Sequence, residues 1–198
     1  SRGRIPLPLT VMQILLVDLG TDMMPALGLG MELPEKGVMD RPPRRQSEPL
    51  LNKHVAIKGF LWYGMMESAF SMLAYFYVNK LNGWPAVPLA GSGTVYAQAT
   101  TMALASIVFC QAGMVLNCRT QSGSLLEVGL FSNKQVVRGI VFEILLISAI
   151  IYVPFLQDIF QTASIGARDW LFLIMLPLIV VLVEELRKYF MRKCVKIK

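Results

Sequence analysis

The sequence is poor in charged residues, histidine and cysteine, and each shortage excludes a class of protein. Only 16% of its 198 residues are Asp, Glu, Lys or Arg, and one is His. Cys110, Cys118 and Cys194 have no CxxC spacing, so neither a disulfide framework nor a zinc site is indicated. A phosphate-binding glycine loop, a dinucleotide fingerprint and a nucleophile elbow are also lacking. The net charge of +6 does not indicate nucleic acid, because the basic residues are distributed as in a membrane protein.

What the chain does contain is apolar runs too long for a soluble core. Hydrophobic residues make up 55% of the chain and the mean hydropathy is +0.54, as in integral membrane proteins. The first run has no basic leader and no small-residue cleavage site, so we do not interpret it as a signal peptide. We predict an all-α integral membrane protein, a bundle of five transmembrane helices at about 5–31, 57–79, 95–117, 139–156 and 170–189.

The positive residues predict how this bundle is oriented. Fifteen of the 19 Lys and Arg lie in or beside the loop 32–56, in the loop after the third span, or in the C-terminal tail. By the positive-inside rule these segments are cytoplasmic, so we expect the N-terminus outside and the C-terminus in the cytoplasm. An odd number of spans that begins outside indicates the back end of a longer protein.

Two acids in the first span dominate the functional interpretation. On a helix, Asp18 and Asp22 are one turn apart and share a face with Thr21. Each Asp opposes insertion by roughly 2.5–3.5 kcal/mol at a helix centre, so both should face the bundle interior. Pro25 has no N–H and should free the carbonyl of Thr21, while Gly20 loosens the helix. Two carboxylates beside a freed carbonyl predict an oxygen-ligand site for a hard cation.

The alternative that both acids only cap or link helices stays open. Other intramembrane polar residues are Glu67 in the second span, Gln111 in the third and Glu143 in the fourth. For Glu67 and Glu143 we favour structural hydrogen bonding or an interfacial position over ligation, because neither has a second acid at helical spacing nor a helix break. For Gln111 both interpretations stay open.

These residues resemble a known family. The stretch 17–25, Val-Asp-Leu-Gly-Thr-Asp-Met-Met-Pro, followed by Val-Met-Asp-Arg-Pro-Pro-Arg at 38–44, is similar to the sixth transmembrane helix and following loop of type II P-type cation-transporting ATPases. The resemblance extends through Gly-Leu-Phe-Ser-Asn at 129–133 and Glu-Glu-Leu-Arg-Lys at 184–188, and so covers essentially the whole chain. It implies that residues 1–198 are the C-terminal transmembrane domain of a cation pump, with the family's helices six to ten.

The resemblance also implies roles for single residues. Asp18, Thr21 and Asp22 match the ion-coordinating positions of helix six, and Gln111 matches a helix-eight position that lines the site. The Asp18-to-Asp22 segment is most similar to the sodium/potassium and proton/potassium pumps, whereas the calcium pump of muscle has an asparagine at position 18 and a glutamate at position 111. The third sodium site of the sodium/potassium pump lacks support, because Met114 and Ile144 replace its acids. The transported cation therefore stays open among Na⁺, K⁺, Ca²⁺ and the proton.

The expected partners are the lipid bilayer and the N-terminal remainder of the pump, with helices one to five and the cytoplasmic domains that would bind ATP and Mg²⁺. No phosphorylation motif or nucleotide-binding domain is found in this sequence, so we expect the chain alone to be inactive. Its expected location is the cell membrane, as a multi-pass protein of a prokaryote, because the loops are short. Two rivals are a channel or secondary-transporter subunit with an acidic ion or proton site, and a structural membrane scaffold.

Overall fold

The protein was analysed as a computed structural model, which describes residues 5–34, 49, 51–120 and 123–196. All its regular elements in these ranges are helical, so the predicted all-α fold is confirmed. In chain order they are α1 (Val11–Leu16), η1 (Val17–Thr21), α2 (Met23–Gly30), α3 (Lys53–Ala56), η2 (Ile57–Tyr63), α4 (Gly64–Leu81), α5 (Gly93–Cys118), α6 (Leu125–Val128), α7 (Lys134–Tyr152), α8 (Pro154–Phe160) and α9 (Ala167–Lys196). Most of the predicted loop 32–56 lies outside the described residues.

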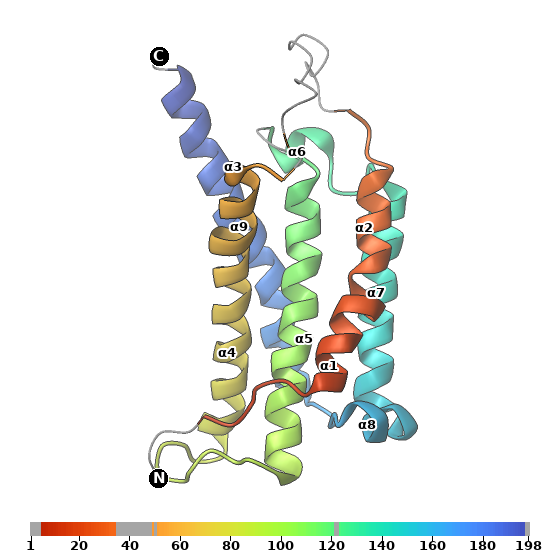
Figure 1. Ribbon diagram of the computed structural model, residues 1–198, viewed down its shortest axis with the longest axis vertical. Helices are drawn as coiled ribbons and strands as arrows, with labels where there is room; N and C mark the ends of the chain where they lie inside the picture. Colours follow the sequence, from red (N-terminus) through yellow and green to blue (C-terminus); the bar gives the residue numbers. More distant parts are fainter. Residues whose placement is uncertain (1–4, 35–48, 50, 121–122, 197–198) are drawn as a thin grey trace.

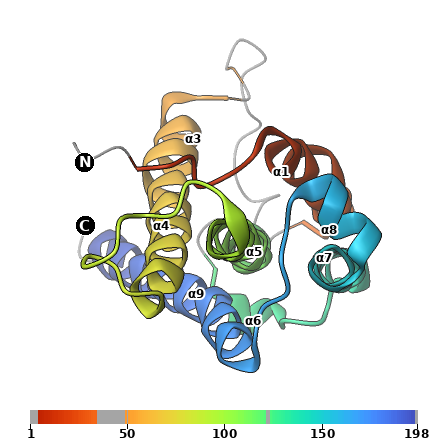
Figure 2. The same ribbon diagram turned by 90° about the horizontal axis from the view of Figure 1, so that it is seen from below.

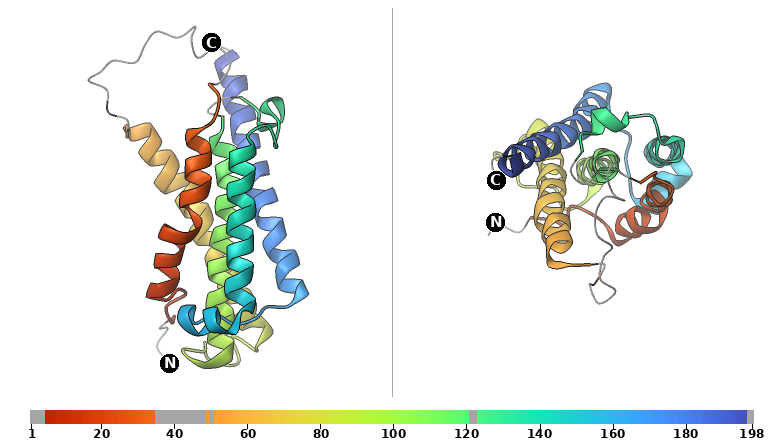
Figure 3. Two further views of the ribbon diagram at one scale, coloured as in Figure 1. Left: turned by 90° about the vertical axis from the view of Figure 1, so that its right-hand side faces the viewer. Right: turned by 90° about the horizontal axis from the view of Figure 1, so that it is seen from above.

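Five long helical stretches form the bundle, and α5 is its centre (Figures 1 and 2). The stretches are α1–η1–α2, α3–η2–α4, α5, α7 and α9, where η1 and η2 are π-helices continuous with their neighbours. The central helix packs closely against α4 and α9, whereas α2 packs mainly on α7 (Figure 3). Small residues make this packing possible, since Ala99, Ala103 and Ala105 of α5 are completely buried.

Local sequence signals determine where several helices begin. Thr10 caps α1 by accepting from the Gln13 N–H at 3.3 Å, while the Gln13 side chain accepts from the Thr10 N–H at 3.1 Å. This reciprocal pair is a capping box. Gln13 is completely buried, and its Nε2 also donates to the carbonyl of Phe160 in α8 at 3.1 Å. The first span is therefore attached to the connection between α7 and α9.

The fourth helix differs from its predicted range, 139–156. Asn133 caps α7 by accepting from the N–H groups of Gln135 and Val136, so the helix begins at Lys134. It ends at Tyr152, because Val153 has extended backbone angles and Pro154 starts the separate helix α8. Proline at the first position of a helix is favoured, whereas the residue before it is pushed out of the helical region.

Three helical stretches in the described part are long and apolar enough to cross a membrane: Val11–Gly30, Gly93–Cys118 and Lys134–Tyr152. The stretch 53–81 and α9 do not meet the same requirements for length, mean hydropathy and number of charged residues. In α9 the uncharged segment 170–183 is flanked by Arg168 and Asp169 on one side and by Glu184 and Glu185 on the other. A predicted span with charged residues at both ends is compatible with a helix whose ends lie at the two membrane surfaces.

Several ion pairs of the described residues lie at the end of the bundle where α5 and α9 finish and α7 begins. This is the upper end in Figure 1. Arg119 is buried there and makes two bonds to the Glu32 carboxylate, 2.7 Å from Nε and 3.0 Å from Nη2. Glu184, also completely buried, accepts from Trp62 Nε1 at 2.9 Å and from Arg187. This is the predicted cytoplasmic end, and which side of a membrane it faces remains a prediction.

Candidate functional site

The irregular turn in the first span lies at the predicted acids. At the end of η1 the N–H of Asp22 donates to the carbonyl of Val17 at 3.2 Å. This acceptor is five residues before the donor, whereas in an α-helix it is four residues before. The hydroxyl of Thr21 donates to the same carbonyl at 3.1 Å. Pro25, which is predicted to free the carbonyl of Thr21, lies in the first turn of α2, and the widened turn comes directly before that helix. Since π-turns occur frequently at functional sites, the segment remains a candidate.

The predicted site residues of the first stretch differ in exposure. Thr21 is completely buried and Asp22 is half-buried, so these two face the bundle interior as expected. Asp18 is exposed in this chain, so the five helical stretches alone do not enclose it. The carboxyl groups of Asp18 and Asp22 nevertheless interact electrostatically with each other.

Gln111 lies on α5 with its amide oxygen buried and without a hydrogen-bond partner among the described residues. A buried polar atom without a partner is unusual in a folded protein. The same helix is also in close contact with α9, because a Cβ on Gly113 would lie 3.0 Å from the Pro177 carbonyl oxygen. The segment of α5 that carries Gln111 is therefore packed tightly against its neighbour.

Two further acids interact electrostatically with Asp22, and both are residues for which the sequence favours a structural or interfacial role. The carboxyl groups of Glu67 on α4 and Glu143 on α7 are both within electrostatic range of Asp22. Glu143 is completely buried, and neither of its oxygens has a hydrogen-bond partner among the described residues. Neither acid has a second acid at helical spacing on its own helix, and the acid that each interacts with is on a different helix. The signal in the sequence that could have identified both acids is their position inside apolar spans, because acids within a membrane often mark functional sites.

Basic side chains do not neutralise this group of acids in the described part of the chain. The ion pairs found there join Lys58 and Arg187 to Glu184, Arg119 to Glu32, and Lys188 to Glu185, at the polar end of the bundle. Within the described ranges, no three His, Cys, Asp or Glu side chains come together closely enough to hold a metal ion by themselves. A cation here would need hydroxyl, amide or carbonyl oxygens as well, or groups from outside this chain.

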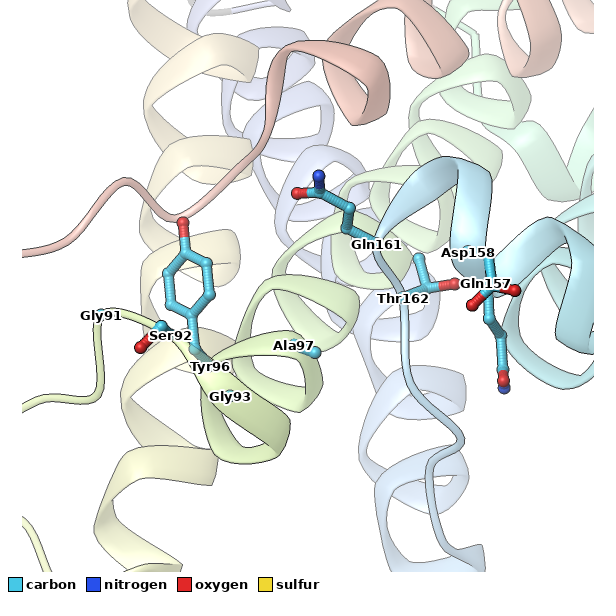
Figure 4. A pocket seen from close by; sticks show the side chains of 9 residues that line it. All are labelled: Gly91, Ser92, Gly93, Tyr96, Ala97, Gln157, Asp158, Gln161 and Thr162. Carbon is cyan, nitrogen blue, oxygen red and sulfur yellow. The ribbon is translucent and has the colours of Figure 1, made fainter.

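A pocket of about 510 Å³ lies at the opposite end of the bundle, between the start of α5 and α8 (Figure 4). Its lining residues are Gly91, Ser92, Gly93, Tyr96, Ala97, Gln157, Asp158, Gln161 and Thr162. Several of its polar groups already have protein partners, since Tyr96 donates to the Leu7 carbonyl at 2.8 Å and Thr162 donates to the Ile150 carbonyl at 2.8 Å. The pocket contains none of the predicted site residues.

Comparison with known proteins decides the family. Residues 6–190 match the family described as "Cation transporting ATPase, C-terminus". The chain belongs to this family. Among similar proteins, the "Calcium-transporting ATPase 1" of Saccharomyces cerevisiae is 32% identical over 193 residues, which is 96% of this chain and 19% of the relative. The mouse "Calcium-transporting ATPase type 2C member 2" is 32% identical over 184 residues, 93% of this chain and 18% of the relative. The "Calcium-transporting ATPase" of Bacillus subtilis is 35% identical over 170 residues, 86% of this chain and 18% of the relative.

The predicted resemblance to the C-terminal membrane region of P-type cation pumps is thus confirmed. The chain spans about a fifth of the length of these relatives. The polar end of the bundle and the buried acids therefore belong to the membrane part of a cation-transporting ATPase.

Proposed function

We propose that this chain is the C-terminal membrane part of an ATP-driven cation pump and supplies ligands for the transported ion. The observation that carries the proposal is Asp22, an acid at the end of a π-turn that faces the bundle interior without a basic partner among the described residues. Placing a carboxylate at such depth is costly unless a cation or a proton accompanies it. Membership of the cation-transporting ATPase family supports the cation.

In the proposed site Asp22 and Asp18 provide negative charge, and Thr21 and Gln111 provide neutral oxygens. Thr21 keeps its hydroxyl oxygen as an acceptor because its hydrogen is donated to Val17. The amide oxygen of Gln111 is buried and has no hydrogen-bond partner among the described residues, so it can coordinate a cation. Asp18 is exposed in this chain, so we propose that it faces helices supplied by the remainder of the pump.

For the ion, we propose Ca²⁺ as the first candidate, because the relatives that match almost the whole chain are named calcium-transporting ATPases. Oxygen ligands of the kinds named above suit this hard divalent cation. Na⁺ is the second candidate, and the observation that favours it is the pair of aspartates at 18 and 22, which is similar to the sodium/potassium pump.

The same proposal covers the organisation of the whole molecule. Residues 1–198 would form the C-terminal transmembrane domain, with the N-terminal end of the first span outside and the end of α9 in the cytoplasm, beside the lipid bilayer and the rest of the pump. ATP and Mg²⁺ would bind to that remainder. We further propose a prokaryotic cell membrane as its location, although the relatives come from both eukaryotes and bacteria.

The test uses the full-length protein that contains this chain, reconstituted in lipid vesicles. ATP hydrolysis and phosphorylation are measured against Ca²⁺ and, separately, Na⁺. We expect one of the two ions to stimulate both, and Asp22→Asn to abolish that stimulation. Exposed Glu127→Gln on α6 is the matched control and should behave as the wild type. Unchanged ion dependence in Asp22→Asn would refute the site, and ion flux without ATP would favour the channel alternative.

A further inference from the structure

The short helix α8 lies across the axis of the bundle, at the end opposite to the polar end (Figures 1 and 3). It follows α7 directly, because Val153 has extended backbone angles and Pro154 begins a new helix. With seven residues, α8 is too short to cross a membrane, since a spanning helix needs about 20. Its role therefore depends on the surface that it presents beside the bundle.

The residues of α8 divide into an apolar side and a polar side. Leu156 and Phe160 are four residues apart, so they share a face, and both pack against the hydrophobic core. Phe155 and Ile159, also four residues apart, lie next to them on the helix surface and are 70% and 39% exposed. Asp158 is exposed on the remaining side and lines the open pocket (Figure 4). The bundle thus covers one part of the apolar side, and the described residues leave the other part uncovered.

The length of α7 places α8 at the level of a membrane surface. The 19 residues of α7 rise about 28 Å along the helix axis, close to the hydrocarbon thickness of about 30 Å. At the α8 end, Trp170 Nε1 donates to the hydroxyl of Tyr152 at 2.6 Å, and this hydroxyl donates to the Ile165 carbonyl at 3.0 Å. Aromatic side chains with a polar group are enriched at the interface between lipid and water. The break between α7 and α8 therefore occurs where the chain meets this interface.

The uncovered side of α8 continues the exposed face of α7 along the chain. Val141, Leu145 and Tyr152 are spaced by four and seven residues, so they share one face of α7, and all three are exposed. Because α7 is long and apolar enough to cross a membrane, this face contacts lipid in a membrane protein. Phe155 comes three residues after Tyr152, directly beyond the break. Lipid is therefore the occupant that suits the uncovered side of α8.

Hydrogen bonds fix the orientation of α8 relative to the rest of the bundle. Its last residue, Phe160, accepts from Nε2 of the buried Gln13 of α1 at 3.1 Å through its carbonyl. In the connection that follows, the N–H of Ala163 donates to the hydroxyl of Thr101 in α5 at 2.9 Å. The exposed apolar side chains of α8 are thus presented by a segment that is attached to two other helical stretches.

We propose that α8 is an in-plane membrane anchor, whose Phe155 and Ile159 side chains insert into the lipid of the adjacent leaflet while Asp158 stays among water and headgroups. A helix with one apolar and one polar side lies in the membrane interface in this way. The inference goes beyond the proposed function, because it does not depend on which residues bind the cation. Through Gln13, the anchor holds the start of the first stretch at a fixed level relative to the membrane surface.

The test is photo-crosslinking of the full-length protein, reconstituted in vesicles of tritium-labelled phosphatidylcholine. The photoreactive amino acid p-benzoylphenylalanine replaces Phe155 in one variant, Ile159 in a second and, as the control on the polar side, Asp158 in a third. After irradiation, the radioactivity bound to the protein is measured on a denaturing gel. We expect about fivefold more lipid adduct from positions 155 and 159 than from position 158, because only the apolar side enters the lipid.

The outcomes distinguish lipid from other occupants of this surface. Lipid adducts at 155 and 159 with little at 158 support the anchor. A crosslink from either apolar position to a polypeptide overturns it, because protein would then cover that side of α8. Equal lipid adduct at all three positions, or none at any, also overturns it, since the membrane surface would then not orient the helix. Both apolar positions are exposed, so a folding failure of one variant leaves the other to decide.

Discussion

Gly139 of α7 lies directly against Pro25 of α2. A Cβ built on Gly139 would come 2.8 Å from the backbone nitrogen of Pro25 and 2.9 Å from its Cα. The contact is reciprocal, because a Cβ on Gly28 of α2 would come 2.8 Å from the backbone nitrogen of Val136 in α7. The two helices therefore approach each other through glycine on both sides, directly beside the turn that carries Asp22.

The first prediction is that Gly139→Ala separates α2 from α7. The neighbouring atoms are backbone and cannot rotate away, so we expect a loss of about 1–3 kcal/mol in the free energy of unfolding, as for other overpacked sites. Gly30→Ala is the matched control, because nothing lies within 4 Å of a Cβ at that position. Thermal unfolding of the detergent-solubilised protein measures both. Equal midpoints for the two variants would show that α2 and α7 do not pack as described.

The second prediction concerns Arg119, which joins the end of α5 to Glu32 and to the loop before α7. Its guanidinium bonds the Glu32 carboxylate twice and also donates to the carbonyls of Gly129 and Leu130 at 2.9 and 3.0 Å. Lysine cannot reproduce this fork, so Arg119→Lys should cost about 1–3 kcal/mol of stability. Arg138→Lys, at an exposed position on α7, should cost little. The idea fails if both variants unfold at the same denaturant concentration.

The third prediction is a pH dependence from Glu32. The hydrogen bond from Arg119 holds the pKa of the Glu32 carboxyl below its ordinary value of 4.5. A carboxyl with a lowered pKa stabilises the folded state fully above its unfolded pKa, and this contribution is lost as the pH falls through the folded pKa. We therefore expect the difference in melting temperature between wild type and Glu32→Gln to be largest near neutral pH. It should shrink below pH 4.5, and a constant difference from neutral to acid pH would contradict this assignment.

The sequence predicted the helices well because apolar runs and caps act locally. Asn133 and Pro154 mark the start of α7 and of α8, and both signals are readable in the chain once they are given more weight than hydropathy. The site was harder to predict. The proximity of Asp22, Glu67 and Glu143 depends on how α2, α4 and α7 are arranged around α5, which no local pattern encodes. The exposure of Asp18 was also unpredictable, because it depends on which neighbouring helices cover that face of the first stretch.

The extra residue in η1 determines how the two halves of the first stretch are rotated about their common axis. Deleting Leu19 would allow an ordinary α-helical turn, and the segment before it would rotate by about 100° relative to α2. Gln13 would then point away from the carbonyls of Phe160 and Gln161, to which its Nε2 now donates. A single inserted position thus lets one helix present its buried amide to α8 and its acid to the bundle centre simultaneously.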